Sequence, residues 1–484
     1  MVHTKESTSD GFRGVMGKDF SFDSVGRAAT GFSRHCKAGR VVVIGYDTRF
    51  RSKEFAERAS QTMRRSGISV IVSSMPVPTP AVTTYALRNK LDGTFMVTAS
   101  HFPWEYNGIV MRFSDGRPPT NMELATMLRS ESKRQREPAC QRMRKKRVGD
   151  IRYENIRRWY VEFLLSSYRT LLDLFKIGEN KNLLVDTIHG TTAGVLSTIL
   201  RKFGWNITEI RSRPPRGIEG ERPDPIEPNL TLLSRRVKDS GTIGVAFDCD
   251  GDRLSFVHPT AGFVGPYVIP PLVLLAVDKY KRDLIKCPVS PKIVKTLPVT
   301  MRVNQIARKL GLSVTEVPVG FANVHSTMSG ENAMIGLGDD SSVTFPNDRT
   351  KDSVLTSLVL LALNNALDLK VTLDKLSREY GQLFHFKNNI RYKDVAKVRS
   401  VLKAFPELCG ELSCTRTVPF ESGIKAFFPQ GWILLRVSGT EDSVRIYAES
   451  RSKRVLESDV SRINSFVCEK LEASPKHTSY TKLN

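Results

Sequence analysis

Short apolar runs alternate with longer segments of helical periodicity over the first half of the chain. The apolar runs are rich in β-branched residues, which is typical of buried strands, and the longer segments place apolar residues on one face. The expected strands lie at 40–45, 69–72, 94–97, 182–186, 205–210 and 244–247, and helices are expected at 54–65, 153–172 and 195–203. This alternation predicts parallel sheet covered by helices, and therefore an α/β fold.

The pattern continues into two further blocks. Apolar helices are expected at 268–277 and 353–367, around a strand at 313–317. The last block opens with the polar stretch 377–391 and ends with two strands and a terminal helix. A chain of 484 residues allows two to four domains. We place the domain boundaries near 150, 262 and 375, which divides the chain into 1–150, 151–262, 263–375 and 376–484.

The charge balance raises the question of a partner. The chain has 73 Lys and Arg against 50 Asp and Glu, a formal net charge of +23, and is 40% hydrophobic, as in globular proteins. The densest basic segment is 129–147, with nine basic residues. This segment is either a solvated surface helix or a docking patch for nucleic acid or an acidic protein. It contains no aromatic residue for base stacking.

Cysteine usage and hydropathy bear on the compartment. The seven cysteines are scattered, their number is odd, and no CxxC pair occurs, so we expect neither a disulfide framework nor a zinc knuckle. No apolar run reaches the roughly 18 residues of a membrane helix. The first ten residues are polar, which is unlike a secretory signal. We therefore expect a cytoplasmic protein with no membrane partner. The sequence does not distinguish a monomer from a homodimer.

An acidic turn follows the expected strand at 244–247. Asp248, Asp250 and Asp252 alternate around Gly251, so their carboxylates can converge on one hard cation such as Mg²⁺. A calcium EF-hand counted from Asp248 would need Gly at its sixth position and Glu at its twelfth, which Arg253 and Pro259 exclude. The alternative to a metal site is a solvated acidic turn.

Two loops offer groups for phosphate chemistry. Ser100 follows the strand at 94–97 and precedes His101, so it is a candidate nucleophile beside a proton-transfer group. No GxSxG surrounds this serine, which disfavours a triad hydrolase. The loop at 436–445 combines two arginines, hydroxyl groups and a glycine, which together suit a phosphate. A polar loop and a hairpin turn are the plain alternatives, as plain turns are for 318–322 and 336–342.

Taken together, these loops resemble those of the α-D-phosphohexomutase superfamily, and most closely its phosphomannomutase/phosphoglucomutase branch. The resemblance covers residues from about 11 to about 470. The matching segments are GFRGVMG at 11–17, GYDTRFRS at 45–52, TASHFPWEYNG at 98–108, VDTIHGTTAG at 185–194, RPDPIEPNL at 222–230, AFDCDGDR at 246–253, PVGF at 318–321 and RVSGTEDSVRIYAE at 436–449.

The resemblance implies a heart-shaped, four-domain enzyme around a central cleft. Three related α/β domains with mixed sheets would carry in turn the phosphoserine, metal-binding and sugar-recognition loops. A C-terminal α+β domain, similar to the TATA-box-binding-protein fold, would carry the phosphate-binding loop. These domains I to IV correspond to 1–150, 151–262, 263–375 and 376–484.

The resemblance also implies roles for individual residues. Ser100 would carry a phosphate and contribute a ligand to Mg²⁺ beside Asp248, Asp250 and Asp252, and His101 and Arg253 would be catalytic. Substrate and phosphate contacts would come from Arg13, Arg49, Gly320, Asp339, Ser341, Arg436, Ser438, Gly439, Thr440 and Arg445. Phospho-Ser100 would convert a hexose 1-phosphate (mannose or glucose) into the 6-phosphate through a hexose 1,6-bisphosphate, which also serves as activator.

Several positions depart from the family pattern. Phe102 stands where Asn is usual, and Val110 and Ala322 stand at two usual lysine positions. The sugar-reading Glu-x-Ser-Gly appears as Asp339-Asp340-Ser341-Ser342, with a shorter acidic side chain. Because an imidazole titrates near neutrality, His101 is the candidate to replace the missing base. We therefore expect either a working but divergent mutase, or an impaired fold that acts as a binding module through its basic surface.

Overall fold

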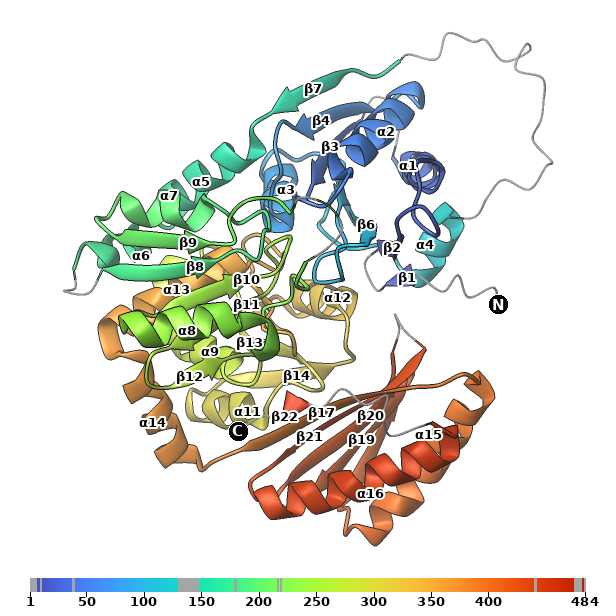
Figure 1. The fold of residues 1–484 in the computed structure, drawn as a ribbon, viewed down its shortest axis with the longest axis vertical. Helices are drawn as coiled ribbons and strands as arrows, with labels where there is room; N and C mark the ends of the chain where they lie inside the picture. Colours follow the sequence, from blue (N-terminus) through green and yellow to red (C-terminus); the bar gives the residue numbers. More distant parts are fainter. Residues whose placement is uncertain are drawn as a thin grey trace.

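A computed structural model describes most of the chain. The described residues are 7–8, 11–36, 40–128, 148–177, 181–215, 217, 220–438, 442–473 and 481–482. The basic segment 129–147 lies outside them. In Figure 1 the chain runs from domain I at the top through domains II and III to domain IV at the bottom.

Domain I is built on a seven-stranded mixed sheet in the order β1-β2-β6-β5-β3-β4-β7. Strands β3, β4, β5 and β7 are parallel, and β1, β2 and β6 add antiparallel pairs. Its elements are β1 (Ser7–Thr8), β2 (Gly11–Val15), α1 (Phe22–His35), β3 (Val41–Tyr46), α2 (Ser52–Arg65), β4 (Ser69–Ser73), α3 (Thr79–Arg88), β5 (Gly93–Val97), β6 (Tyr106–Phe113), α4 (Asn121–Leu128) and β7 (Ile151–Glu154).

Domains II and III carry smaller sheets in the orders β12-β11-β10-β8-β9 and β14-β13-β15-β16. Domain II comprises α5 (Ile156–Ser167), α6 (Arg169–Asp173), η2 (Leu174–Lys176), β8 (Asn182–Asp186), α7 (Val195–Arg201), β9 (Asn206–Ile210), η3 (Glu227–Leu230), α8 (Thr231–Ser240), β10 (Gly244–Phe247), β11 (Leu254–His258) and β12 (Gly262–Val264). Domain III comprises α9 (Ile269–Lys279), α10 (Lys281–Leu284), β13 (Ser290–Thr296), α11 (Met301–Lys309), β14 (Ser313–Val317), α12 (Phe321–Glu331), β15 (Ala333–Leu337), β16 (Val343–Thr344), α13 (Ser353–Leu367) and α14 (Leu369–Tyr380).

The three α/β domains share one core topology. In each domain the first strand pairs in parallel with the second and the third, and a fourth strand returns antiparallel to the third. The four core strands are β3–β6 in domain I, β8–β11 in domain II and β13–β16 in domain III. The α/β fold expected from the alternating pattern is therefore confirmed, and so are the mixed sheets that the resemblance implies.

Domain IV is an antiparallel sheet in the order β18-β19-β20-β21-β17-β22. Helices α15 and α16 cover one face of it (Figure 1). The other face packs Trp432, Leu434 and Tyr447 against Leu297 of domain III. Its elements are β17 (Phe384–Arg391), α15 (Val395–Glu411), β18 (Arg416–Phe420), β19 (Gly423–Phe428), β20 (Gly431–Val437), β21 (Ser443–Ser450), α16 (Lys453–Leu471) and β22 (Thr481–Lys482).

The helix expected over 153–172 begins later and is broken. Tyr153 and Glu154 pair with Val72 and Ser73, so they complete the domain I sheet as part of β7. The Asn155 side chain then accepts the Arg158 backbone N–H and caps α5. Periodicity alone could not separate these segments, because pairing with β4 depends on residues about 80 positions earlier.

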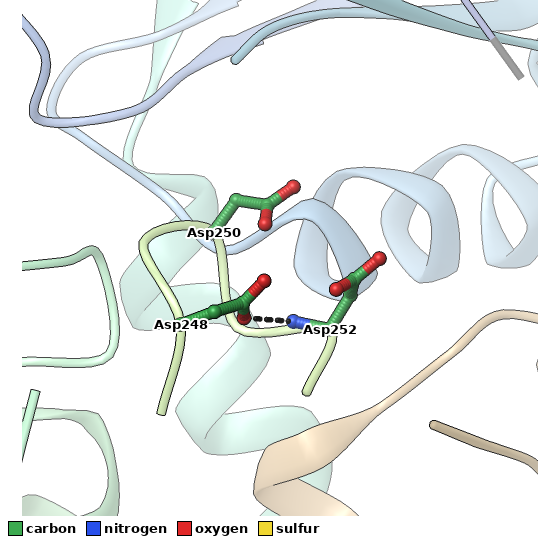
Figure 2. A group of neighbouring side chains, drawn as sticks. All are labelled: Asp248, Asp250 and Asp252. Atoms are coloured by element: carbon green, nitrogen blue, oxygen red, sulfur yellow. Dashed lines mark hydrogen bonds between the residues drawn. The ribbon is translucent and has the colours of Figure 1, made fainter. Parts of the chain in front are cut away.

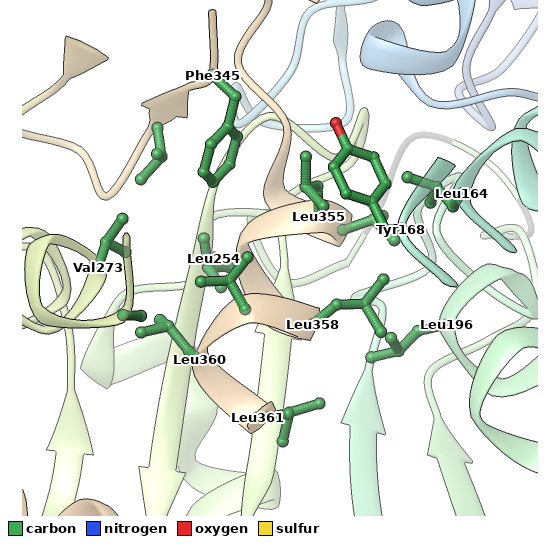
Figure 3. Packing of buried hydrophobic residues seen from close by; sticks show 14 of the residues in the cluster. Leu164, Tyr168, Leu196, Leu254, Val273, Phe345, Leu355, Leu358, Leu360 and Leu361 are labelled. Carbon is green, nitrogen blue, oxygen red and sulfur yellow. The ribbon is translucent and has the colours of Figure 1, made fainter. Parts of the chain in front are cut away.

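Helix α13 joins the cores of domains II and III. Its N-cap Asp352 accepts the Leu355 backbone N–H and is bonded by the Tyr160 hydroxyl of α5. Figure 3 shows its leucines among apolar side chains of both domains, including Leu196, Leu254 and Val273. This continuous core also reaches domain I, so the three α/β domains are packed as one body.

The apolar helices and the cysteines of the described residues bear on the expectations about membrane spans and disulfides. Among the described helices, none is long and apolar enough by itself to cross a membrane. Helices α13 and α14, which are bent relative to each other, reach the required length and apolar composition only when they are taken together. Helix α13 is, however, largely buried inside the protein. The six described cysteines are free.

We predict that Leu358→Ala lowers the free energy of unfolding by about 2–5 kcal/mol, because it opens a cavity between domains II and III. Leu367→Ala on the same helix is the control, because Leu367 is 48% exposed. Denaturant unfolding would test this. Equal midpoints for the two variants would contradict the packing role of α13.

Candidate active site

The four domains meet around one cavity of about 390 Å³. Its size lies in the range of small-molecule sites. All four domains contribute ionisable residues to its lining. These include Arg13 and His101 of domain I; Arg222, Asp224, Glu227, Asp252 and Arg253 of domain II; Asp339, Asp340 and Lys351 of domain III; and Lys387, Arg436 and Arg445 of domain IV.

The shared topology explains how the loops converge. In each α/β domain a short loop joins the third core strand to the antiparallel fourth. These loops hold Ser100 after β5, Asp248 to Arg253 after β10, and Asp339 to Ser342 after β15. Each follows the carboxyl end of a central strand, where α/β folds place ligands. Three copies of one connection therefore supply three different chemical groups to the cavity.

The acidic loop gathers three carboxylates. Asp248, Asp250 and Asp252 each place an oxygen within 4.8 Å of the others, and Figure 2 shows the three groups beside one loop. One oxygen of Asp248 accepts the backbone N–H groups of Asp252 and Arg253. Asp250 Oδ1 and Asp252 Oδ1 are buried and have no hydrogen-bond partner.

The electrostatics of this loop favour a bound cation. Burial, together with the neighbouring Asp252 and Asp250, raises the pKa of Asp248 well above its ordinary value. Burial and Asp252 likewise raise the pKa of Asp250 to about 6. Oxygen ligands of this kind suit Mg²⁺, so the side chains present fit the metal expected from the sequence.

Three domains hold the acidic loop in place. From domain I, Thr79 at the start of α3 donates its hydroxyl to Asp250 at 2.6 Å. From domain III, the Ser353 hydroxyl at the start of α13 donates to the Gly251 carbonyl at 2.6 Å. From within domain II, the Thr191 N–H bonds the Cys249 carbonyl. Displacement of one domain would therefore disturb the carboxylates directly.

Ser100 lies directly against this loop. Its hydroxyl donates to Asp248 Oδ2 at 2.8 Å, and His101 Nδ1 is 3.4 Å from the same hydroxyl oxygen. The backbone of Ser100 has a φ of +50°, a strained conformation for a non-glycine residue, and its N–H is held by Thr98. The nucleophile expected from the sequence and the expected metal ligands thus form one centre.

A cationic clamp faces this centre from domain IV. Arg436, Ser438 and Arg445 line the cavity, as the sequence suggested. Arg436 Nε is buried and has no hydrogen-bond partner. Gly439 and Thr440, expected in the same loop, lie outside the described residues.

Matches to four family models cover most of the chain. Their descriptions read phosphoglucomutase/phosphomannomutase alpha/beta/alpha domain I over residues 4–136, domain II over 159–262, domain III over 272–382 and C-terminal domain over 388–463. The chain belongs to the phosphoglucomutase/phosphomannomutase family. It is therefore an intramolecular phosphotransferase of the phosphohexomutase type.

Individual relatives agree with this assignment. A phosphoglucomutase/phosphomannomutase of Thermococcus kodakarensis is 26% identical over 463 residues, covering 92% of this chain and 94% of its own. A probable phosphoglucosamine mutase of Methanothermobacter thermautotrophicus is 25% identical, with the same coverage. The crystal structure of a putative phosphomannomutase from Thermus thermophilus is similar with a TM-score of 0.76 at 26% identity, covering 95% and 98% of the two chains.

Arg49 has a different position in this mutase from the substrate contact expected for it. It does not line the cavity. Its guanidinium lies behind the serine loop, where it donates to the carbonyls of Ser100, Phe102, Pro103 and Tyr106. Asp47 balances its charge at 3.2 Å, and both side chains are fully buried. We therefore assign Arg49 the role of positioning Ser100.

The two loops of domain III that were expected to contact the sugar differ in detail from the expectation. Gly320, Asp339 and Ser342 line the cavity, whereas the expected Ser341 is buried and does not. Ser341 has a positive φ of +65°, and its Oγ is buried without a hydrogen-bond partner. Asp339 accepts the Thr296 hydroxyl at 3.1 Å.

Arg253 connects the acidic loop to the loop that follows β15. Its Nε lies 3.0 Å from Asp340 Oδ2, and a terminal nitrogen lies 3.8 Å from Asp224. Burial alone would raise the pKa of Asp340, but Lys351 and Arg253 hold it below its ordinary value. Burial also lowers the pKa of His101 well below its ordinary value, helped by Arg253, Arg222, Arg13 and Arg445.

Sequence reasoning did not single out several lining residues. Arg222 and Asp224 stand in the matched segment 222–230, so that motif could have identified them. Tyr267, Lys351 and Lys387 stand in no matched motif. Only the packing of domains II, III and IV brings these three to the cavity.

We predict that Arg49→Met lowers the free energy of unfolding by about 3–5 kcal/mol, because it leaves Asp47 as a buried unpaired charge. It also releases four carbonyls of the serine loop. Amide hydrogen exchange of residues 98–108 should accelerate in this variant. Arg51→Met is the matched control, since Arg51 is 49% exposed beside Glu54; unchanged exchange in Arg49→Met would refute the positioning role.

We predict that Asp250→Asn weakens Mg²⁺ binding by at least about tenfold. Without metal its unfolding temperature should not fall, because the neutral amide removes the repulsion that raises the pKa of Asp250. Calorimetric titration with MgCl₂ and thermal unfolding with and without it would measure both effects. Asp239→Asn on the exposed face of α8 is the control. Equal Mg²⁺ affinity in both variants would remove Asp250 from the site.

Proposed function

We propose that this mutase interconverts hexose 1-phosphate and hexose 6-phosphate through a phosphoserine at Ser100 and a hexose 1,6-bisphosphate. The supporting observation is the contact of the Ser100 hydroxyl with Asp248, across the cavity from the arginines of domain IV. A serine bound to a cluster of acidic metal ligands suits phosphoryl transfer, and a separate cationic clamp suits a second phosphate.

The proposed reaction assigns a role to each side of the cavity. The Oγ–P bond of phospho-Ser100 breaks as a bond from phosphorus to a sugar hydroxyl oxygen forms. The proton that this hydroxyl loses is transferred to the leaving Oγ, so Ser100 regains its hydroxyl. Asp248, Asp250 and Asp252 would hold Mg²⁺ together with Ser100. The metal, when bound, neutralises charge on the transferring oxygens. Arg253, fixed by Asp340 and Asp224, points its guanidinium at the same region.

The clamp of domain IV would bind the phosphate that does not react. Arg436 and Arg445 lie opposite each other on β20 and β21. Their guanidinium groups can bind phosphate oxygens in pairs. The same clamp must accept the bisphosphate in two orientations, so that either phosphate can reach Ser100. Gly439 and Thr440 of the same loop stay predicted members of the clamp.

The proton-transfer role of His101 stays a prediction. Its Nδ1 lies 3.4 Å from the Ser100 hydroxyl oxygen, and burial together with four nearby arginines lowers the pKa of the ring well below its ordinary value. The sugar preference, mannose or glucose, also stays open. Asp339 and Ser342 face the cavity where the usual glutamate and glycine would stand, so the sugar contacts differ from the family pattern.

Phosphopeptide mass spectrometry would test the proposal after incubation with Mg²⁺ and glucose 1,6-bisphosphate. We expect phosphate on Ser100, and turnover of glucose 1-phosphate or mannose 1-phosphate. Ser100→Ala should lose both, by at least about 10³-fold in turnover, because the nucleophile is removed. Ser240→Ala is the control, since Ser240 is exposed on α8.

Absence of phosphate on Ser100 in the folded, Mg²⁺-loaded protein would overturn the proposal. The second candidate function, a binding module acting through its basic surface, would then take its place. Binding to a polyanion that weakens steeply with salt would support that function. Mutase turnover should depend on salt much less.

A further inference from the structure

The centre around Ser100 lacks lysine at both positions where the family pattern has one. Val110 is buried within β6. Ala322 follows Phe321 at the start of α12 and carries no charge. The transferring phosphoryl group nevertheless carries charge on three oxygens. Besides Mg²⁺ and Arg253, a further cation beside the acidic loop would help to balance this charge.

Lys351 reaches this region from a different segment. It precedes Asp352, the N-cap of α13, and its backbone forms a β-bridge with Thr344. Its ammonium lies 3.6 Å from Asp252 and 3.4 Å from Asp340. The side chain lines the cavity and is 17% exposed, so it is fixed in direction yet accessible to a ligand.

The ammonium of Lys351 also lies beside the loop that lacks a lysine. Its Nζ is 6.0 Å from the centre of the Phe321 ring. Phe321 stands between Gly320, which lines the cavity, and Ala322. A positive charge is thus present next to this loop although the loop itself carries none.

We propose that Lys351 is a catalytic residue of this mutase and that its ammonium binds the phosphoryl group as it moves between Ser100 and the sugar. The inference rests on the proposed function. Lys351 and Ser100 contact the acidic loop through Asp252 and Asp248 respectively, so the ammonium lies next to the expected metal ligands. Arg253 already pairs with Asp340 at 3.0 Å, so Asp340 orients both cations toward the cavity.

The lysine of domain IV would have a different task. Lys387 lies over the Tyr447 ring at 5.3 Å, beside the arginine clamp. It would therefore hold the phosphate that does not react. Loss of Lys387 should weaken substrate binding, whereas loss of Lys351 should slow the chemical step. The two lysines line the same cavity, and these different kinetic effects would distinguish their roles.

Kinetics of four variants would test the proposal, with glucose 1-phosphate and mannose 1-phosphate as substrates and glucose 1,6-bisphosphate as activator. Lys351→Met should lower kcat by about 10²-fold with a smaller change in KM, as for loss of one preorganised charge at a transition state. Lys351→Arg, which keeps the charge, should retain kcat within about tenfold of the wild type. Lys387→Met should mainly raise KM.

Lys292→Met is the matched control, because Lys292 pairs with Glu331 away from the cavity and is 42% exposed. Single-turnover transfer of phosphate from labelled phospho-Ser100 to glucose 1-phosphate should slow in Lys351→Met as kcat does. The Mg²⁺ affinity of unphosphorylated Lys351→Met, measured by calorimetry, should not fall. The substitution removes a cation beside Asp252, so it removes repulsion toward Mg²⁺.

Wild-type transfer rates in Lys351→Met would overturn the inference and leave the proposed function intact. Equal losses in Lys351→Met and Lys351→Arg, with lower unfolding temperatures or weaker Mg²⁺ binding, would show a structural role and also overturn it. A wild-type protein without phosphoserine or turnover would instead refute the proposed function, and the inference with it.

Discussion

The crowding of three carboxylates, two of them buried and the third partly exposed to the cavity, governs the arrangement of the site. Asp248, Asp250 and Asp252 repel one another in a region of low dielectric, and this cost is visible in the raised pKa values of Asp248 and Asp250. The fold opposes it with hydrogen bonds from Thr79 and Ser353 and with nearby cations. Because these groups come from different domains, the acidic loop couples the domain packing to the state of the metal site.

A repeated topology makes this convergence possible. Each α/β domain places one short loop after its third core strand, and each loop carries a different group: a serine, a set of carboxylates, or polar groups suited to a sugar. The continuous core around α13 then fixes the three loops relative to one another. Domain IV joins through a smaller contact, in which Leu297 packs on Trp432, Leu434 and Tyr447, and adds the arginine clamp.

The sequence predicts those parts of the molecule that are encoded locally. Buried parallel strands such as β3 and β10 are recognisable because they are short apolar runs, and the loops after them carry dense motifs. The start of α5, the buried role of Arg49 and the exchange of Ser341 for Ser342 were not predictable in this way. The first two depend on partners distant in sequence: β4 for Tyr153 and four loop carbonyls for Arg49. No local signal separates the buried Ser341 from Ser342, which lines the cavity.

Electrostatic stabilisation of a transition state depends on where a charge lies in the active site. The sequence segment that carries the charge matters less. Val110 and Ala322 remove two positive charges that the motif pattern would provide within its own loops. Lys351 brings one back from the turn before α13, over the ring of Phe321 and against Asp252 and Asp340. A comparison of the motif positions alone would indicate that the centre around Ser100 has lost two positive charges. The cavity lining nevertheless contains Arg253 and Lys351 beside the acidic loop, and Arg436, Arg445 and Lys387 from domain IV, which suits the two phosphates of the proposed bisphosphate.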